Sequence, residues 1–232
     1  MVFVFCSCHK KEDFVCVSLN DFDSLRTAGY DVSADNVFSN IRALMGSDTT
    51  NSIADIHARR HYRKDMDMLW IKRDGVSSNA DTLLTFIQRV DSFGFSREKF
   101  YYSMLKEDLQ RVRVLDFDSL ESSRNTADKV FARLEYYLTK AFLRYTEGQR
   151  FGFMNPFQAF NRLDKRNDDT IHVSYRSLYG WNTSLPGSNY LATACSVIKG
   201  DGEKFTDFLA KSKPHNPLYN KYVDELNKTN DK

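Results

Sequence analysis

The chain has 232 residues, of which 41% are hydrophobic, and a formal net charge of +2. This hydrophobic content is enough to bury a core, and four prolines with ten glycines argue against long disordered tracts. Acidic and basic residues are interleaved, so the sequence has no extended basic surface and nucleic acid is not an expected partner. We therefore expect one soluble domain with a small N-terminal annex.

The first eight residues, MVFVFCSC, are apolar and are followed by an abruptly polar stretch. This pattern resembles the end of a bacterial lipoprotein signal, in which Ser7 would precede the cleavage point and Cys8 would carry the lipid. No basic segment precedes it and the apolar run is short, which suggests that the true start lies upstream of residue 1. The competing interpretation is an accidental apolar end or an N-terminal strand. We assign residues 1–20 to a lipoprotein-like N-terminus and tether, and residues 21–232 to the main domain.

The first predicted helices cover residues 36–45 and 53–62, separated by a polar loop at 46–52. His57 and His61 are spaced i, i+4 in the second of these helices, a spacing that can hold a metal ion.

Two arginines, Arg59 and Arg60, lie between these histidines and disfavour a cation, and Asp65 and Asp67 belong to the following loop. We therefore predict no metal site here, and we interpret the segment as a solvated, basic helix end.

A helix is predicted from the cap residues 77–79 to Phe93, with Gly94 ending it, and another over 97–112. The longest predicted helix begins near Thr126, a possible N-cap, and its pattern stops at Gly148. Its apolar residues recur at helical period, which indicates a buried face at the centre of a helical core. They are Val130, Phe131, Leu134, Tyr137, Leu138, Ala141, Phe142 and Tyr145.

The helical pattern breaks between residues 161 and 186, where a short strand at 171–175 is the only β element we expect. Short helices over 189–198, 204–210 and 218–227 follow. The predicted fold class is all-α: a multi-helix bundle around the long central helix, with at most a minor β element.

The central helix contains the segment LEYYLTKAFLRY at 134–145, followed by Arg150, Phe151 and Gly152 and then Asn155 and Pro156. These residues resemble the hallmark helix and exit of the scaffold domain of the large L,D-transpeptidases, the periplasmic enzymes that crosslink peptidoglycan stems through a catalytic cysteine. Three further segments resemble the same family in the same order. They contain His61-Tyr62 with Leu69-Trp70-Ile71, then ADTLLTFI at 80–87 with Phe93-Gly94-Phe95, and finally PHNPLY at 214–219 with Leu226. The resemblance covers about 57–228.

The family's catalytic motif, Ser-x-Gly-Cys-x-Arg, has no counterpart in this chain. Cys195 lies in ATACSVI among small and apolar residues, a setting typical of a buried core cysteine. The prediction is a chain without catalytic residue or cofactor.

The resemblance implies a non-catalytic scaffold module that positions a catalytic domain or peptidoglycan during cell-wall crosslinking. The implied partners are peptidoglycan or an L,D-transpeptidase catalytic domain. The implied location is the bacterial cell envelope, in the periplasm, with the membrane contacted only through a lipid on Cys8. Two alternatives stay open: the N-terminal portion of a complete transpeptidase, and a helical adaptor lipoprotein with no peptidoglycan role.

The candidate residues for an interdomain or ligand-binding face are Trp70, Tyr145, Arg150 and Phe151. A purely structural interpretation competes for each of them. Trp70 and Tyr145 have the character of core residues, and Arg150 is placed to satisfy carbonyl groups at the end of the helix.

Overall fold

The computed structural model describes residues 33–64, 67–72, 75–153 and 184–230, and this part of the chain is an all-α bundle with one minimal hairpin. The predicted fold class is confirmed. In chain order the elements are α2 (Ala34–Ser47), α3 (Ile53–Lys64), β1 (Ile71–Lys72), β2 (Gly75–Val76), α4 (Asn79–Ile87), η1 (Val90–Phe93), η2 (Arg97–Phe100), α5 (Tyr102–Val114), α6 (Ala127–Phe151), α8 (Tyr190–Lys199), α9 (Gly202–Ser212) and α10 (Pro217–Asn230).

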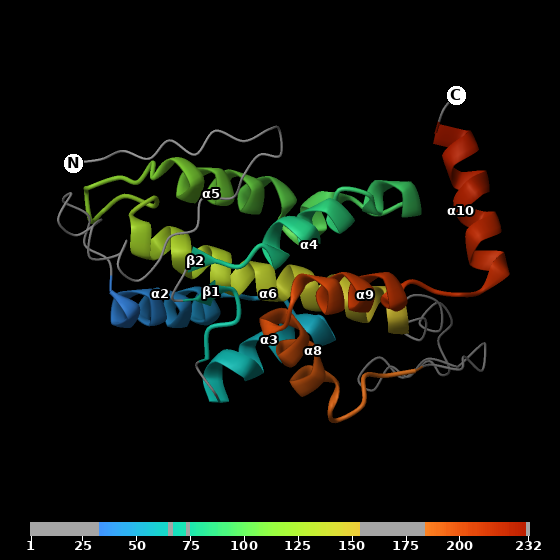
Figure 1. Cartoon of the computed structure of the whole chain (residues 1–232), viewed down its shortest axis with the longest axis horizontal. Helices are drawn as coiled ribbons and strands as arrows, with labels where there is room; N and C mark the ends of the chain where they lie inside the picture. Colours follow the sequence, from blue (N-terminus) through green and yellow to red (C-terminus); the bar gives the residue numbers. More distant parts are fainter. Residues whose placement is uncertain (1–32, 65–66, 73–74, 154–183, 231–232) are drawn as a thin grey trace, which may run out of the picture.

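Helix α6 runs through the middle of the bundle, with α4 and α5 on one side and α2, α3 and α8 on the other (Figure 1). Its 25 residues are buried on nearly every face, including all of the predicted apolar stripe except Tyr137, which is half-buried. A helix buried all round takes its stability from the neighbours packed against it rather than from intrinsic helix propensity. Helices α2, α3, α4, α5 and α9 therefore hold their positions by contact with α6.

Aromatic packing joins α9 to the middle of α6. The ring of Trp70 lies edge-on to those of Phe142 and Phe205, with centroids 6.1 and 5.8 Å away. Phe142 also stacks on Phe205 and Phe208, at 5.4 and 5.9 Å. Aromatic pairs at these separations stabilise a core by about 0.5–1.5 kcal/mol each beyond the area they bury.

The long helix continues through Gly148 and ends at Phe151, so the predicted stop at Gly148 is wrong. Gly148 is needed for close packing rather than for a turn: a Cβ there would lie 2.1 Å from the ring of Phe153, which folds back onto the helix. The chain leaves the helix at Gly152, whose positive φ of 100° suits glycine. Gly152, not Gly148, therefore ends the helix.

Two predicted helices are each divided by a break. The segment predicted over 97–112 forms η2 and α5, which meet at Tyr101 in the left-handed region with φ of 61°. The segment predicted to end at Phe93 leaves α-helical geometry after Ile87 and then forms η1, which ends at Gly94 with φ of 81°. Hydrophobic periodicity survives a single 3-10 turn, so it could not reveal these breaks.

Two residues each from β1 and β2 pair antiparallel, with Ile71 opposite Val76. This is a different place from the strand predicted at 171–175, which lies outside the described residues.

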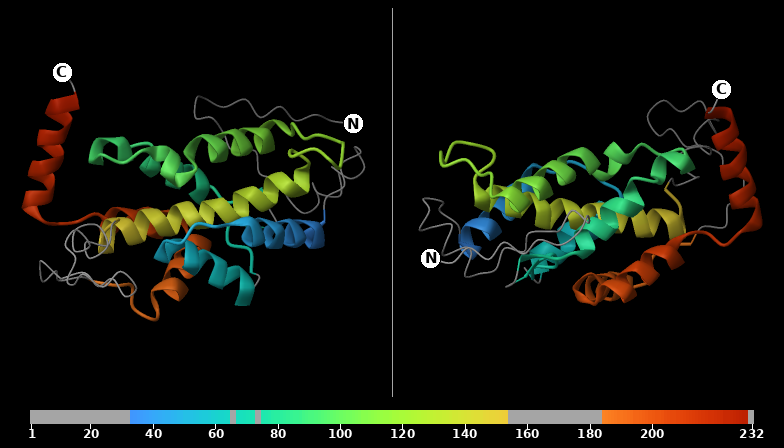
Figure 2. Two further views of the ribbon diagram at one scale, coloured as in Figure 1. Left: turned by 180° about the vertical axis from the view of Figure 1, so that it is seen from behind. Right: turned by 45° about the horizontal axis from the view of Figure 1, so that its top comes forward.

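Helix α10 projects from one end of the bundle in both views of Figure 2. It is held there by η1: the ring of Tyr219 lies 6.2 Å from that of Phe93, and Leu226 packs over Gly94. Within the described residues, no helix has the length and apolar character needed to cross a membrane.

Candidate functional site

Two of the four residues predicted for an interaction face lie in the core. Trp70 is fully buried, and its indole N–H donates to the hydroxyl of Thr139 at 2.9 Å. Tyr145 is 3% exposed, with its ring 6.0 Å from that of Phe86 and 6.5 Å from that of Phe100. Both positions fit the competing structural interpretation.

The other two predicted residues lie at the exit of α6, where solvent reaches them. Arg150 is exposed, and its guanidinium lies 5.7 Å from the ring centroid of Phe151. Phe151 is half-buried and packs edge-on against Tyr190 of α8 at 5.3 Å. Of the predicted face, Arg150 is therefore exposed and Phe151 partly exposed.

The polar centre of the bundle is Glu135, a fully buried carboxylate about a third of the way along α6. It accepts hydrogen bonds from the backbone N–H groups of Leu69, Trp70 and Ile71, at 2.5, 3.0 and 3.0 Å. The hydroxyl of Tyr62 on α3 donates to the same carboxylate at 2.8 Å. One side chain thus fixes α3 and the segment leading into β1 against the central helix.

Burial raises the pKa of the Glu135 carboxyl, and the backbone N–H groups and the Tyr62 hydroxyl lower it without fully compensating. The pKa of Tyr62 is raised by its own burial and by the neighbouring Glu135. A buried carboxylate that lost these four hydrogen-bond donors would cost much free energy. The arrangement therefore favours the single geometry in which all four donors reach Glu135.

A second buried cluster, which we call the ion network, joins α2, α3 and α6. It contains two carboxylates and three cations: Asp48, Asp55, Arg59, Lys140 and Arg144. Lys140, only 1% exposed, donates to Asp48 at 2.6 Å and lies 3.5 Å from Asp55. Arg59 donates to Asp48 at 3.1 Å, and Arg144 to Asp55 at 2.8 Å. The network places each of its cations within ion-pair distance of a carboxylate where the three helices meet.

Burial alone would raise the pKa of Asp48, but hydrogen bonds from Lys140, Thr50 and Tyr136 hold it well below its usual range. The pKa of Asp55 is also lowered: burial acts against its ionisation, and Arg144 and Ser52 outweigh that effect. Both carboxylates are therefore charged and paired at neutral pH.

The prediction of a solvated helix end around His57 and His61 is wrong for both histidines. His57 is half-buried and its Nδ1 lies 2.7 Å from a carboxylate oxygen of Glu147. His61 is 5% exposed, its Nε2 lies 2.8 Å from the carbonyl oxygen of Asp67, and its Nδ1 lies 3.7 Å from the sulfur of Cys195. The reason is that α3 turns this face toward α6 and α8, which a single helix pattern does not reveal.

Cys195 lies within α8 and packs against the core. It is half-buried rather than fully buried as predicted. The described ranges contain no group of three or more histidine, cysteine, aspartate or glutamate side chains able to hold a metal ion. The predicted lipidation site, Cys8, lies outside the described residues.

Sequence reasoning missed Glu135 and the ion network. The available signal was that charged residues fall inside the otherwise apolar faces of the long helix, as Glu135 and Lys140 do. A charge at such a position implies a buried partner, but the partner itself, dozens of residues away, is set by the fold.

The fold and its buried polar centre define an all-α bundle whose helices are joined by buried charged groups. A comparison with family models identifies it further: the Scaffold domain model matches residues 53–226, three quarters of the chain and almost the same span as the resemblance found from motifs. The chain belongs to this family, the scaffold domain of the L,D-transpeptidases. No curated protein and no solved structure matches the chain.

Proposed function

We propose that this chain is a non-catalytic scaffold module of a peptidoglycan L,D-transpeptidase system, which positions a catalytic domain or peptidoglycan during cell-wall crosslinking. The observation that carries the proposal is the family match over residues 53–226. The module would act in the bacterial envelope, on the periplasmic side, held to the membrane through a lipid on Cys8.

The buried polar contacts support a positioning role, because a scaffold must hold its outer surfaces in fixed relation. Glu135 and the ion network tie α2, α3, β1 and α6 together through paired charges. Such networks favour one arrangement when every member is satisfied. The accessible exit of α6, at Arg150 and Phe151, supplies a place for a neighbouring domain to dock.

The proposal also holds that the chain does not catalyse crosslinking. Nucleophilic catalysis by a cysteine needs an activated thiolate in an accessible setting. Cys195 is half-buried inside a helix and lacks the family's catalytic motif around it.

Co-sedimentation tests the proposal. The full chain is mixed with purified sacculi, or with an immobilised L,D-transpeptidase catalytic domain, and the bound fraction is measured. Binding to either one, weakened by Arg150→Glu and unchanged by Lys221→Glu on exposed α10, is the expected result. Binding to neither, with capture of an unrelated envelope protein instead, would favour an adaptor with no peptidoglycan role.

A further inference from the structure

A basic groove of about 630 Å³ lies along the outer side of α3. Five of its lining residues, Ile56, Arg59, Arg60, Arg63 and Lys64, fall at i, i+3, i+4, i+7 and i+8, so they form one stripe along the helix. Asn51 completes the lining, and among the residues that the structure describes no acidic one takes part in it.

Three of these cations are unpaired within the described part of the chain. Arg60, Arg63 and Lys64 are exposed, and no carboxylate there forms an ion pair with them. The described carboxylates nearest to them along the chain are Asp55, which is paired with Arg144, and Asp67, which is paired with Lys199 of α8. Among the described residues, the groove thus has open hydrogen-bond donors and cations with no carboxylate partner.

The charge behind the groove has the same sign. Its inner wall is Arg59, which belongs to the ion network, where three cations share two carboxylates. The stripe therefore continues a positive surplus that begins inside the protein.

Helix α3 itself explains only part of this charge. Basic residues in a last turn interact favourably with the helix dipole, whose negative end is equivalent to about half a charge. The three exposed cations, Arg60, Arg63 and Lys64, exceed that amount. Arg60 lies a full turn before the end of α3, where the dipole effect has fallen off.

We propose that this groove binds a carboxylate-bearing peptide in extended conformation. Guanidinium groups bind carboxylates through two parallel hydrogen bonds, and successive turns of α3 present them about 5.4 Å apart. Alternate side chains of an extended peptide lie about 6.5 Å apart on one side, a difference of about 1 Å per step that long arginine and lysine side chains can span. Ile56, 46% exposed at the start of the stripe, offers an apolar contact for an uncharged residue of the peptide.

The same surface fits a membrane poorly. Helices that lie on anionic lipid combine a basic face with several bulky apolar residues, and the exposed apolar residues of α3 are only Ile53 and Ile56. The groove's volume falls within the range of sites that hold small ligands or short segments. This inference does not depend on whether peptidoglycan is the partner of the module.

Fluorescence anisotropy with the full chain tests the inference. The probe is a short fluorescein-labelled peptide in which glutamate alternates with alanine, and the reference is the same peptide with glutamine in place of glutamate. We expect the glutamate peptide to bind and the glutamine peptide not to bind. The double variant Arg60→Glu/Arg63→Glu should weaken binding at least about tenfold, because it removes two charge-assisted contacts and adds repulsion.

The matched control is Lys106→Glu/Lys221→Glu, which makes the same change in net charge at exposed positions on α5 and α10. Circular dichroism melting of both variants establishes that they fold. Equal weakening by the control would overturn the inference, because the effect would then be one of overall charge. Displacement of the peptide by inorganic phosphate at equal concentration, or binding to phosphatidylglycerol vesicles without binding to the peptide, would overturn it as well.

Discussion

At the scale of single residues, the protein concentrates its polar chemistry in the interior of one helix. Glu135 satisfies three consecutive backbone N–H groups that no strand or helix partner takes up, since Leu69, Trp70 and Ile71 donate to it. Backbone donors buried without acceptors destabilise a fold. The Glu135 carboxylate therefore supplies the acceptors that a neighbouring strand or helix would otherwise provide. The position is structural, and it holds the segment carrying Trp70 in the core.

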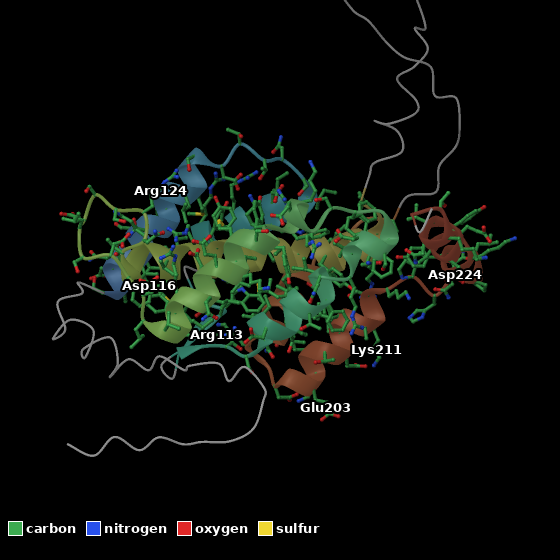
Figure 3. The ribbon with its side chains drawn as sticks, turned by 90° about the horizontal axis from the view of Figure 1, so that it is seen from above. Arg113, Asp116, Arg124, Glu203, Lys211 and Asp224 are labelled. Atoms are coloured by element: carbon green, nitrogen blue, oxygen red, sulfur yellow. The ribbon has the colours of Figure 1, made fainter. Side chains whose placement is uncertain are left out.

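Glu135→Gln is expected to lower the free energy of unfolding by about 2–4 kcal/mol, because an amide NH₂ would then face N–H donors. Hydrogen exchange supplies a local readout: the amides of Leu69, Trp70 and Ile71 should exchange faster than in the parent protein. Glu203→Gln, at the exposed side chain on α9 labelled in Figure 3, is the matched control. Unchanged exchange at all three amides would contradict the role assigned to Glu135.

The ion network makes the free energy of unfolding decrease at acidic pH. The pKa of Asp48 is held below its usual range in the folded protein, so the unfolded chain binds a proton at higher pH than the folded one. The contribution of Asp48 to the free energy of unfolding is therefore fully present above the pKa of aspartate in the unfolded chain, about 3.9. It is lost as the pH falls below that value.

Asp48→Asn should cost about 3–5 kcal/mol at pH 7, since Lys140 and Arg59 lose a buried partner. It should also reduce the fall in stability below about pH 4, because the group that must be protonated is gone. Urea unfolding followed across this pH range measures both effects. Asp224→Asn, at an exposed residue of α10 labelled in Figure 3, is the control and should change neither quantity. If the stability of Asp48→Asn fell below about pH 4 as steeply as that of the parent protein, the role assigned to Asp48 would be refuted.

At the scale of elements, the apolar period of the long helix was sufficient to predict its existence and its central place. Its end was not predictable from the pattern, because Gly148 has the same appearance in sequence whether it stops a helix or admits a ring. The ring is that of Phe153, which packs on Gly148 and lies 4.1 Å from the ring of Phe95 and 6.0 Å from that of Phe100.

Gly148→Ala should therefore destabilise the protein by about 1–3 kcal/mol, because its Cβ displaces the Phe153 ring and outweighs the helix propensity gained. Gly46→Ala in α2 is the control: nothing lies within 4 Å of the added Cβ, and a gain of about 0.5–1 kcal/mol is expected. Thermal melting of both variants distinguishes packing from propensity. Stabilisation by both substitutions would show that Phe153 does not depend on this glycine.

The basic stripe on α3 shows another limit of pattern reading. In the sequence, Arg59 and Arg60 are an ordinary charge run of the kind that covers a solvated helix. In the fold, Arg59 turns inward to Asp48 while Arg60 stays outside. Adjacent residues on a helix point about 100° apart, so which one is buried depends on neighbouring helices rather than on the run itself.

At the scale of the whole molecule, motif resemblance predicted the family and most of the chain it covers, because the family's segments keep their order along the sequence. The candidate face was harder to predict. Trp70 and Tyr145 belong to matching motifs but lie in the core, so their motifs report packing rather than contact with a partner. Arg150 and Phe151, next to the exit of α6, remain accessible.

The central claim is that the chain assists peptidoglycan crosslinking without catalysing it. The measurement that tests it most directly is a muropeptide assay, analysed by chromatography and mass spectrometry, on the purified chain alone, a purified L,D-transpeptidase catalytic domain alone, and the two together. The account predicts no crosslinked product and no D-amino acid exchange from the chain alone, and more product from the mixture than from the catalytic domain by itself. Crosslinking by the chain alone, or a mixture no more active than the catalytic domain, would contradict it.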